Sequence, residues 1–120
     1  TPSSVPAAIA ALDIVIQEPE RVARLVKNAE FVRSGLKDAG FNVIDGRTAI
    51  VPVLIGDNKK AFGLWKGLFD EGIFVNVFIP PATPPNKSMM RNSFMATHEP
   101  DHLEKVVECY TKIGKKLGII

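Results

Sequence analysis

Arg91 is the residue whose type and setting best suit binding chemistry. It follows the proline-rich run 79–85, in an alternating segment that places Met90 and Phe94 on one face of a predicted strand and Arg91 and Ser93 on the other. A guanidinium on a rigid strand beside a stiff loop suits a carboxylate, because its planar fork matches the two oxygens. Exposed arginines are also common on sheet surfaces, so spacing alone favours an ordinary solvated side chain over a binding residue.

No other group of residues forms a familiar catalytic pattern. Gly63 and Gly67 fall inside a helical pattern, where close packing explains them better than a phosphate-binding loop. His98 and His102 are four residues apart, but Pro100 lies between them at a predicted helix start, so they are not expected to share one helical face. The expectation is therefore no metal site, with His98 forming hydrogen bonds at a strand-to-helix junction.

Composition limits the partners of the chain. Its 120 residues suit one domain, and 15 basic against 13 acidic residues leave a net charge of only +2. The one basic run, 112–116, lies in the last turns of a predicted helix, where it complements the helix dipole and needs no nucleic acid. No segment has the ~18 apolar residues of a membrane span. The single cysteine, Cys109, cannot form an internal disulfide, which fits the reducing cytoplasm.

The elements that must position Arg91 follow from hydrophobic periodicity and from capping and turn residues. Helices are predicted at 7–16, 19–39, 58–71 and 100–117, and strands at 41–44, 50–55, 73–79 and 89–95. The second helix is expected to carry an apolar stripe with a 3.6-residue period: Val22, Leu25, Val26, Ala29, Val32 and Leu36. Pro52 suggests that the second strand is an edge strand or contains a bulge.

The connections between most neighbouring strands are too short for parallel crossovers. The chain is therefore predicted to be an α+β domain with helices on one face of a small, mostly antiparallel sheet. Strands 73–79 and 89–95 should be neighbours through the proline loop, with Arg91 on the face that the helices leave uncovered. The start of the chain, with no initiator methionine, suggests a fragment.

Short motifs also occur in a distinctive order along the whole chain. They are Ser4-Val5-Pro6-Ala7, Lys37-Asp38-Ala39-Gly40-Phe41, Ile50-Val51-Pro52-Val53-Leu54-Ile55-Gly56-Asp57, Gly72-Ile73-Phe74-Val75, Pro81-Ala82-Thr83-Pro84, Arg91-x-Ser93, Ala96-Thr97-His98 and Lys112-Ile113-Gly114-Lys115-x-Leu117-Gly118. Together they resemble the C-terminal domain of the α-oxoamine synthases. These pyridoxal-phosphate enzymes of the aspartate-aminotransferase fold condense an amino acid with an acyl-CoA and release CO2.

The resemblance implies roles for particular residues. Arg91 would bind the carboxylate of the amino-acid substrate, and Ser3 or Ser4 would help hold the cofactor phosphate of the neighbouring subunit in a homodimer. Ala82 occupies the loop position where several members place a threonine near the substrate, and Thr83 follows it. By the same resemblance, Asn92 stands where an aliphatic residue is expected, which would weaken the core face of its strand.

The resemblance also implies what this chain lacks. The Schiff-base lysine and most pyridoxal-phosphate contacts would belong to a preceding large domain. Residues 1–120 would then form a single C-terminal domain, with the helix in 1–17 linking it to the large domain. No catalytic residue is expected here, and the fragment should be inactive alone.

Several members of this group remain open. Residues 72–76, the 81–84 loop and residues 94–98 look most like bacterial serine palmitoyltransferase, an enzyme of sphingolipid biosynthesis, whereas the 110–118 tail looks more like 2-amino-3-oxobutyrate CoA ligase. An aminolevulinate or 8-amino-7-oxononanoate synthase would share the same arginine. The alternative from another class is a stand-alone α+β ligand-binding module that uses Arg91 for an acidic metabolite.

Overall fold

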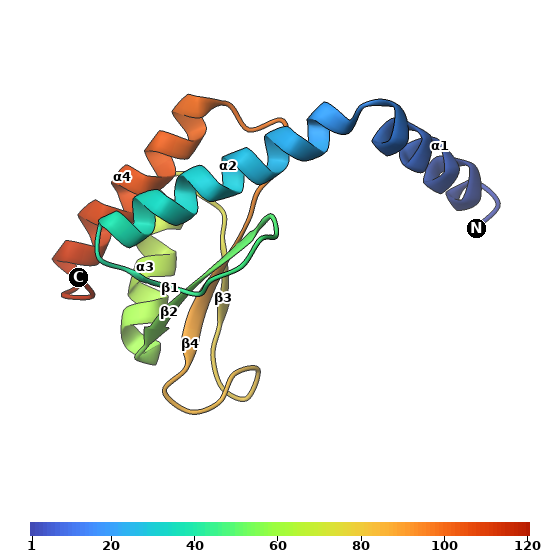
Figure 1. The fold of residues 1–120 in the computed structure, drawn as a ribbon. Coiled ribbons are helices and arrows are strands. Elements are labelled where there is room, and N and C mark those ends of the chain that lie inside the picture. Colours follow the sequence, from blue (N-terminus) through green and yellow to red (C-terminus); the bar gives the residue numbers. More distant parts are fainter.

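The computed structural model describes all residues from 1 to 120 and contains four helices and four strands (Figure 1). In chain order these elements are α1 (Ser4–Gln17), α2 (Pro19–Asp38), β1 (Asn42–Val43), β2 (Ile50–Gly56), α3 (Asn58–Asp70), β3 (Asn76–Phe78), β4 (Ser88–Ser93) and α4 (Pro100–Lys116). None of these helices combines the length and apolar character that crossing a membrane requires.

The sheet has the strand order β1-β2-β4-β3, and all its neighbouring strands are antiparallel. Helices α2, α3 and α4 cover one face of it, and α1 projects away from the rest (Figure 1). The proline loop joins β3 to β4, and these two strands pair directly. The predicted α+β class, the single layer of helices and the pairing across the proline loop are therefore confirmed.

The core lies between the inner face of the sheet and the three covering helices. Strand β4 alternates as predicted, because Met90 is fully buried toward the helices while Arg91 and Ser93 are exposed. On α4, the fully buried Tyr110 packs edge-on against Phe41, with their ring centres 5.6 Å apart. The helices thus hold β4 from one side and leave the Arg91 face open.

Asn92 does not weaken the core face of β4, contrary to the sequence-based expectation. The side chain is buried, and its Nδ2 donates a hydrogen bond to the Val51 carbonyl at 2.9 Å. The Tyr110 hydroxyl donates to Asn92 Oδ1 at 2.6 Å. A buried amide with these partners avoids the cost of an unpaired polar group and joins α4 to both central strands.

The interpretation of Pro52 as a sign of an edge strand was wrong. Strand β2 has neighbours on both sides, and its register irregularity lies between Leu54 and Gly56 rather than at the proline. The Pro52 carbonyl accepts a hydrogen bond from Ile44 N at 3.0 Å, but a proline nitrogen cannot return one. Strand β1 ends one residue earlier, at Val43, so the missing donor interrupts no strand pair.

Two predicted elements are shorter or less buried than expected. The strand predicted at 73–79 is reduced to Asn76–Phe78. The stripe of α2 is not buried along its whole length, because Val22 and Val26 are 44% and 45% exposed. The first half of α2 runs beyond the sheet toward α1 (Figure 1), so burial on this helix begins only at Asn28.

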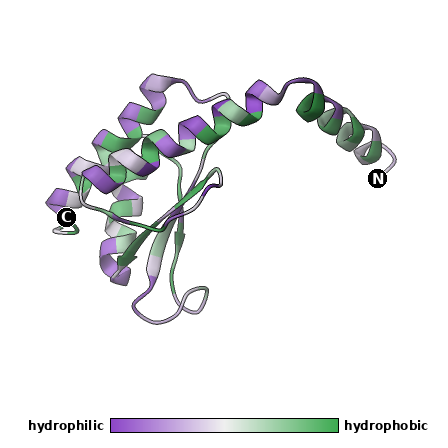
Figure 2. Ribbon diagram, in the orientation of Figure 1, coloured by the Kyte–Doolittle hydropathy of each residue, from purple (hydrophilic) through white to green (hydrophobic).

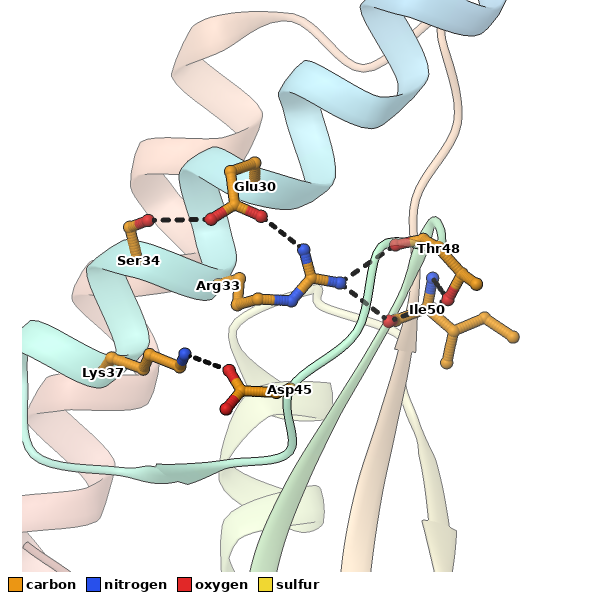
Figure 3. A network of polar contacts seen from close by, with 7 residues as sticks. All are labelled: Glu30, Arg33, Ser34, Lys37, Asp45, Thr48 and Ile50. Atoms are coloured by element: carbon orange, nitrogen blue, oxygen red, sulfur yellow. Dashed lines mark hydrogen bonds and ion pairs between the residues drawn. The ribbon is translucent and has the colours of Figure 1, made fainter.

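A buried arginine of α2 fixes the loop that leads into β2 (Figure 3). The Arg33 side chain is almost fully buried, and its Nη2 donates to the carbonyls of Thr48 at 3.0 Å and Ile50 at 3.3 Å. Its Nη1 donates to Glu30 at 2.6 Å, within the same helix. The start of β2 is therefore attached to α2 by charge-assisted hydrogen bonds.

Candidate functional site

Arg91 lies in the middle of β4 on the face without helices. Its strand neighbours are Pro52 on β2 and Asn76 on β3, neither of which carries a charge. The guanidinium carbon lies 4.7 Å from the centre of the Phe78 ring, a cation–π contact that holds the side chain over β3. No carboxylate lies within ion-pair distance of Arg91, so its donors are available to an anion from outside the chain.

The proline loop holds one buried polar side chain in the segment that leads into this strand. Ala82 is exposed and presents only a methyl group, whereas Thr83 is buried and its Oγ1 has no hydrogen-bond partner. A buried hydroxyl without a partner costs free energy unless a ligand or water completes it. Of the two loop residues expected near the substrate, Thr83 therefore retains the unused polar group, although no hydrogen bond joins it to Arg91.

Ser3 and Ser4 lie at the start of α1, the helix that projects away from the sheet carrying β4 (Figure 1). Thr1 Oγ1 is 3.2 Å from the Ser3 hydroxyl and 2.6 Å from the Ser4 hydroxyl, so three exposed hydroxyl groups form one cluster. Ser3 occupies the N-cap position, but its side chain makes no capping hydrogen bond. The predicted site residues thus form two separate groups, one at the start of α1 and one on β4 and the proline loop.

The junction between β4 and α4 is built from side-chain to backbone hydrogen bonds. His98 Nδ1 accepts from Met95 N at 3.2 Å, which confirms the predicted hydrogen-bonding role of this histidine. His102 Nδ1 accepts from Glu99 N at 3.1 Å, in a capping box that begins α4. The two imidazole rings lie edge to face, with their centres 6.3 Å apart.

Asn28 is a polar residue of this junction that the sequence analysis missed. It is buried on α2, and its Nδ2 donates to the carbonyls of Met95 at 3.1 Å and His98 at 3.0 Å. The signal that could have revealed it is its place beside Ala29 in the buried part of the stripe, where a polar side chain needs a partner.

A family comparison places this geometry among known proteins. The model of the aminotransferase class I and II family matches residues 1–109. The chain belongs to this family. The small antiparallel sheet that carries Arg91 also occurs in a solved structure of a serine palmitoyltransferase.

Individual relatives make the resemblance more specific. The chain is 38% identical over 119 residues to serine palmitoyltransferase from Sphingobacterium spiritivorum, covering 99% of this chain and 30% of the relative. It is also 38% identical over 120 residues to 8-amino-7-oxononanoate synthase from Lysinibacillus sphaericus, covering 100% of this chain and 31% of the relative. The chain therefore spans about a third of these curated relatives, whose C-terminal part it matches.

A solved structure gives the same result in three dimensions. A high-resolution structure of serine palmitoyltransferase with its pyridoxal-phosphate internal aldimine superimposes with a TM-score of 0.94 and 33% identity. The match covers 99% of this chain and 30% of that one. The predicted resemblance to the C-terminal domain of an α-oxoamine synthase is therefore confirmed.

Proposed function

We propose that this chain is the substrate-carboxylate-binding domain of a pyridoxal-phosphate-dependent acyltransferase of the serine palmitoyltransferase type. The whole enzyme condenses an amino acid, serine or glycine, with an acyl-CoA and releases CO2. The observation that carries the proposal is Arg91, a guanidinium held over Phe78 on an open sheet face with no acidic partner in the chain. The serine palmitoyltransferase relatives, in sequence and in structure, support it.

Arg91 binds the amino-acid carboxylate through two parallel N–H···O hydrogen bonds. Bidentate contact fixes the direction of the Cα substituents as well as the position of the substrate, which a point charge such as lysine cannot do. The uncharged neighbours Pro52 and Asn76 leave the carboxylate as the only counter-ion of the guanidinium. Arg91 thereby orients the bond at Cα that the reaction must break.

The hydroxyl cluster of Thr1, Ser3 and Ser4 fits the phosphate of the cofactor. Hydroxyl groups gathered at a helix N-terminus are donors that phosphates bind. When bound, pyridoxal phosphate supplies an electron sink for the substrate Cα. In this proposal Ser3 and Ser4 contact the cofactor of the partner subunit, the other cofactor contacts lie outside this chain, and the chain alone is inactive.

The proposed enzyme is a cytoplasmic homodimer, and the surface of α1 supports a position for this helix that is covered by other parts of the dimer. No residue of this helix is buried, and six large apolar side chains are 45–75% exposed: Val5, Ile9, Leu12, Ile14, Val15 and Ile16. Figure 2 shows this apolar helix standing clear of the core. A contiguous apolar surface of this kind marks an interaction site, which the proposal assigns to the large domain and the second subunit.

Two other acyltransferase reactions are alternatives to the serine palmitoyltransferase reaction. The match to 8-amino-7-oxononanoate synthase has the same 38% identity as the match to serine palmitoyltransferase. Another relative, from Thermus thermophilus, is named for both 8-amino-7-oxononanoate synthase and 2-amino-3-ketobutyrate coenzyme A ligase activities. A panel of amino acids and acyl-CoA chain lengths separates these reactions. Membership of a transferase family argues against the stand-alone binding module.

The proposal is tested with Arg91→Ala and Arg91→Lys in the full-length enzyme. Arg91→Ala should lower kcat/KM for the amino acid by roughly 30- to 1000-fold, equivalent to about 2–4 kcal/mol, because a charged hydrogen-bonding partner is lost. Arg91→Lys should recover only part of this. The matched control is Arg47→Ala, another exposed arginine without an ion pair. If Arg91→Ala behaves like Arg47→Ala, Arg91 does not bind the substrate.

A further inference from the structure

We propose that Asn28 on α2 and His98 in the loop between β4 and α4 are positioning residues for Arg91. The proposal rests on the carboxylate-binding role of Arg91 given above. The loop concerned is 94–99, which continues from the end of β4 into α4 and is called the 94–99 loop below. Arg91 lies on β4, only a few residues before this loop.

The two side chains hold both backbone groups of Met95. Asn28 Nδ2 donates to the Met95 carbonyl at 3.1 Å, and the Met95 amide donates to His98 Nδ1 at 3.2 Å. The same Asn28 nitrogen donates to the His98 carbonyl at 3.0 Å, so one buried amide closes the loop onto α2. The two Asn28 contacts constrain the loop because they are partly buried, so breaking either one leaves a poorly hydrated group unpaired.

These contacts begin where the sheet stops supporting β4. Strand β3 pairs with β4 only at Met89, Met90 and Arg91, so Arg91 is the last residue of β4 with a strand neighbour on that side. Beyond it, β4 is paired with β2 alone, ending with a hydrogen bond from Phe94 N to Ala49 O at 3.1 Å. Asn28 and His98 therefore fix the free end of the strand that carries Arg91.

Helix α2 holds the neighbouring strand at the same corner. Arg33 donates to the carbonyls of Thr48 and Ile50, and Ile50 is the register partner of Ser93 on β4 (Figure 3). Both strands that meet next to Arg91 are thus attached to one rigid helix of 20 residues. The other end of α2 continues into α1, which carries Ser3 and Ser4, so α2 joins the two groups of proposed site residues.

The role of His98 depends on a ring nitrogen that accepts a hydrogen bond. A protonated imidazole carries a hydrogen on both nitrogens, so it cannot accept the bond from Met95 N. The charged and titratable groups that line the grooves around His98 come from α2 and from the start of α4: Arg24, Lys27, Glu99, His102 and Lys105. The one acid among them, Glu99, is already paired with Arg24 at 2.6 Å.

The test measures amino-acid and acyl-CoA kinetics of the full-length holoenzyme with Asn28→Leu, His98→Leu and His98→Asn. Asn28→Leu and His98→Leu should raise the amino-acid KM about 10- to 100-fold through misplacement of Arg91, with an unchanged acyl-CoA KM. His98→Asn should recover most of the affinity, because its Oδ1 can accept the Met95 N–H.

Ile113→Val is the matched control for loss of stability alone. It truncates a buried residue of α4 that packs against Gly67, away from the 94–99 loop. It should lower stability by about 0.5–1.5 kcal/mol and leave both KM values unchanged. If Asn28→Leu and His98→Leu shift KM no more than this control while Arg91→Ala does, the positioning role is wrong and the proposed function stands. If Arg91→Ala leaves the amino-acid KM unchanged, both proposals fail.

Discussion

The buried pair of Tyr110 and Asn92 allows a quantitative test of how α4 holds the strand of Arg91. Replacing Tyr110 with phenylalanine keeps the edge-on packing against Phe41 but removes the 2.6 Å hydrogen bond to Asn92 Oδ1. Because both side chains are buried, the Asn92 oxygen loses its donor without gaining water. The expected loss in the free energy of unfolding is about 1–3 kcal/mol.

The contribution of Tyr110 to stability can also be tested at alkaline pH. Burial raises the pKa of the Tyr110 hydroxyl, because the phenolate is poorly solvated in the core. Because the pKa of Tyr110 is higher in the folded than in the unfolded state, the neutral hydroxyl contributes stability that is fully present below the unfolded pKa of ~10. This contribution is lost as pH rises from the unfolded toward the folded pKa. Between about pH 10 and 11, wild type should therefore lose about 1 kcal/mol more than Tyr110→Phe.

Urea unfolding of the 120-residue chain at several pH values measures both effects. Trp65 fluorescence reports unfolding, and phenolate absorbance reports Tyr110 directly because it is the only tyrosine of the chain. A double-mutant cycle with Asn92→Leu should show a coupling of about 1–2 kcal/mol. The reasoning is refuted if Tyr110→Phe loses less than about 0.5 kcal/mol, or if its difference from wild type is independent of pH above 10.

Two further predictions concern packing. Gly114→Ala should lower the free energy of unfolding by about 1–3 kcal/mol, because the added Cβ would overlap the Phe41 ring. The control Gly46→Ala, whose Cβ would meet nothing within 4 Å, should change it little, and equal losses in urea melts would contradict this. Leu12→Gln and Ile16→Gln on α1 should leave the stability of the isolated chain within about 0.5 kcal/mol but weaken the full-length dimer in sedimentation, because these side chains are 62% and 75% exposed. A large loss in the isolated chain would show that α1 packs on this domain.

The sequence predicts the element types and the exposure of Arg91 because both depend on local patterns. Alternation around Met90 requires only that one face of β4 is buried. Asp57 caps α3 through a local contact, with its carboxylate accepting from Lys60 N at 2.8 Å. The order of short motifs is likewise a property of the sequence itself. These features therefore need no knowledge of how the helices pack.

Features that depend on distant partners could not be predicted in this way. The environment of Asn92 is set by Tyr110 from another element, and that of Asn28 by a loop about 70 residues later in the chain. The exposure of Val22 and Val26 follows from the extension of α2 past the sheet, although their spacing is that of a buried stripe. Periodicity indicates which face of a helix is apolar but not how much of it is covered.

The most direct test of the central claim compares an amino acid with its carboxamide in the full-length enzyme. Serine and serinamide are titrated against wild type and Arg91→Ala, with the change in cofactor absorbance as the measure of binding. Wild type should prefer serine by about 30-fold or more, because only the carboxylate accepts both hydrogen bonds from Arg91. Arg91→Ala should bind the two ligands with similar affinity. If Arg91→Ala keeps the wild-type preference for serine, another residue binds the carboxylate and the account of this site is wrong.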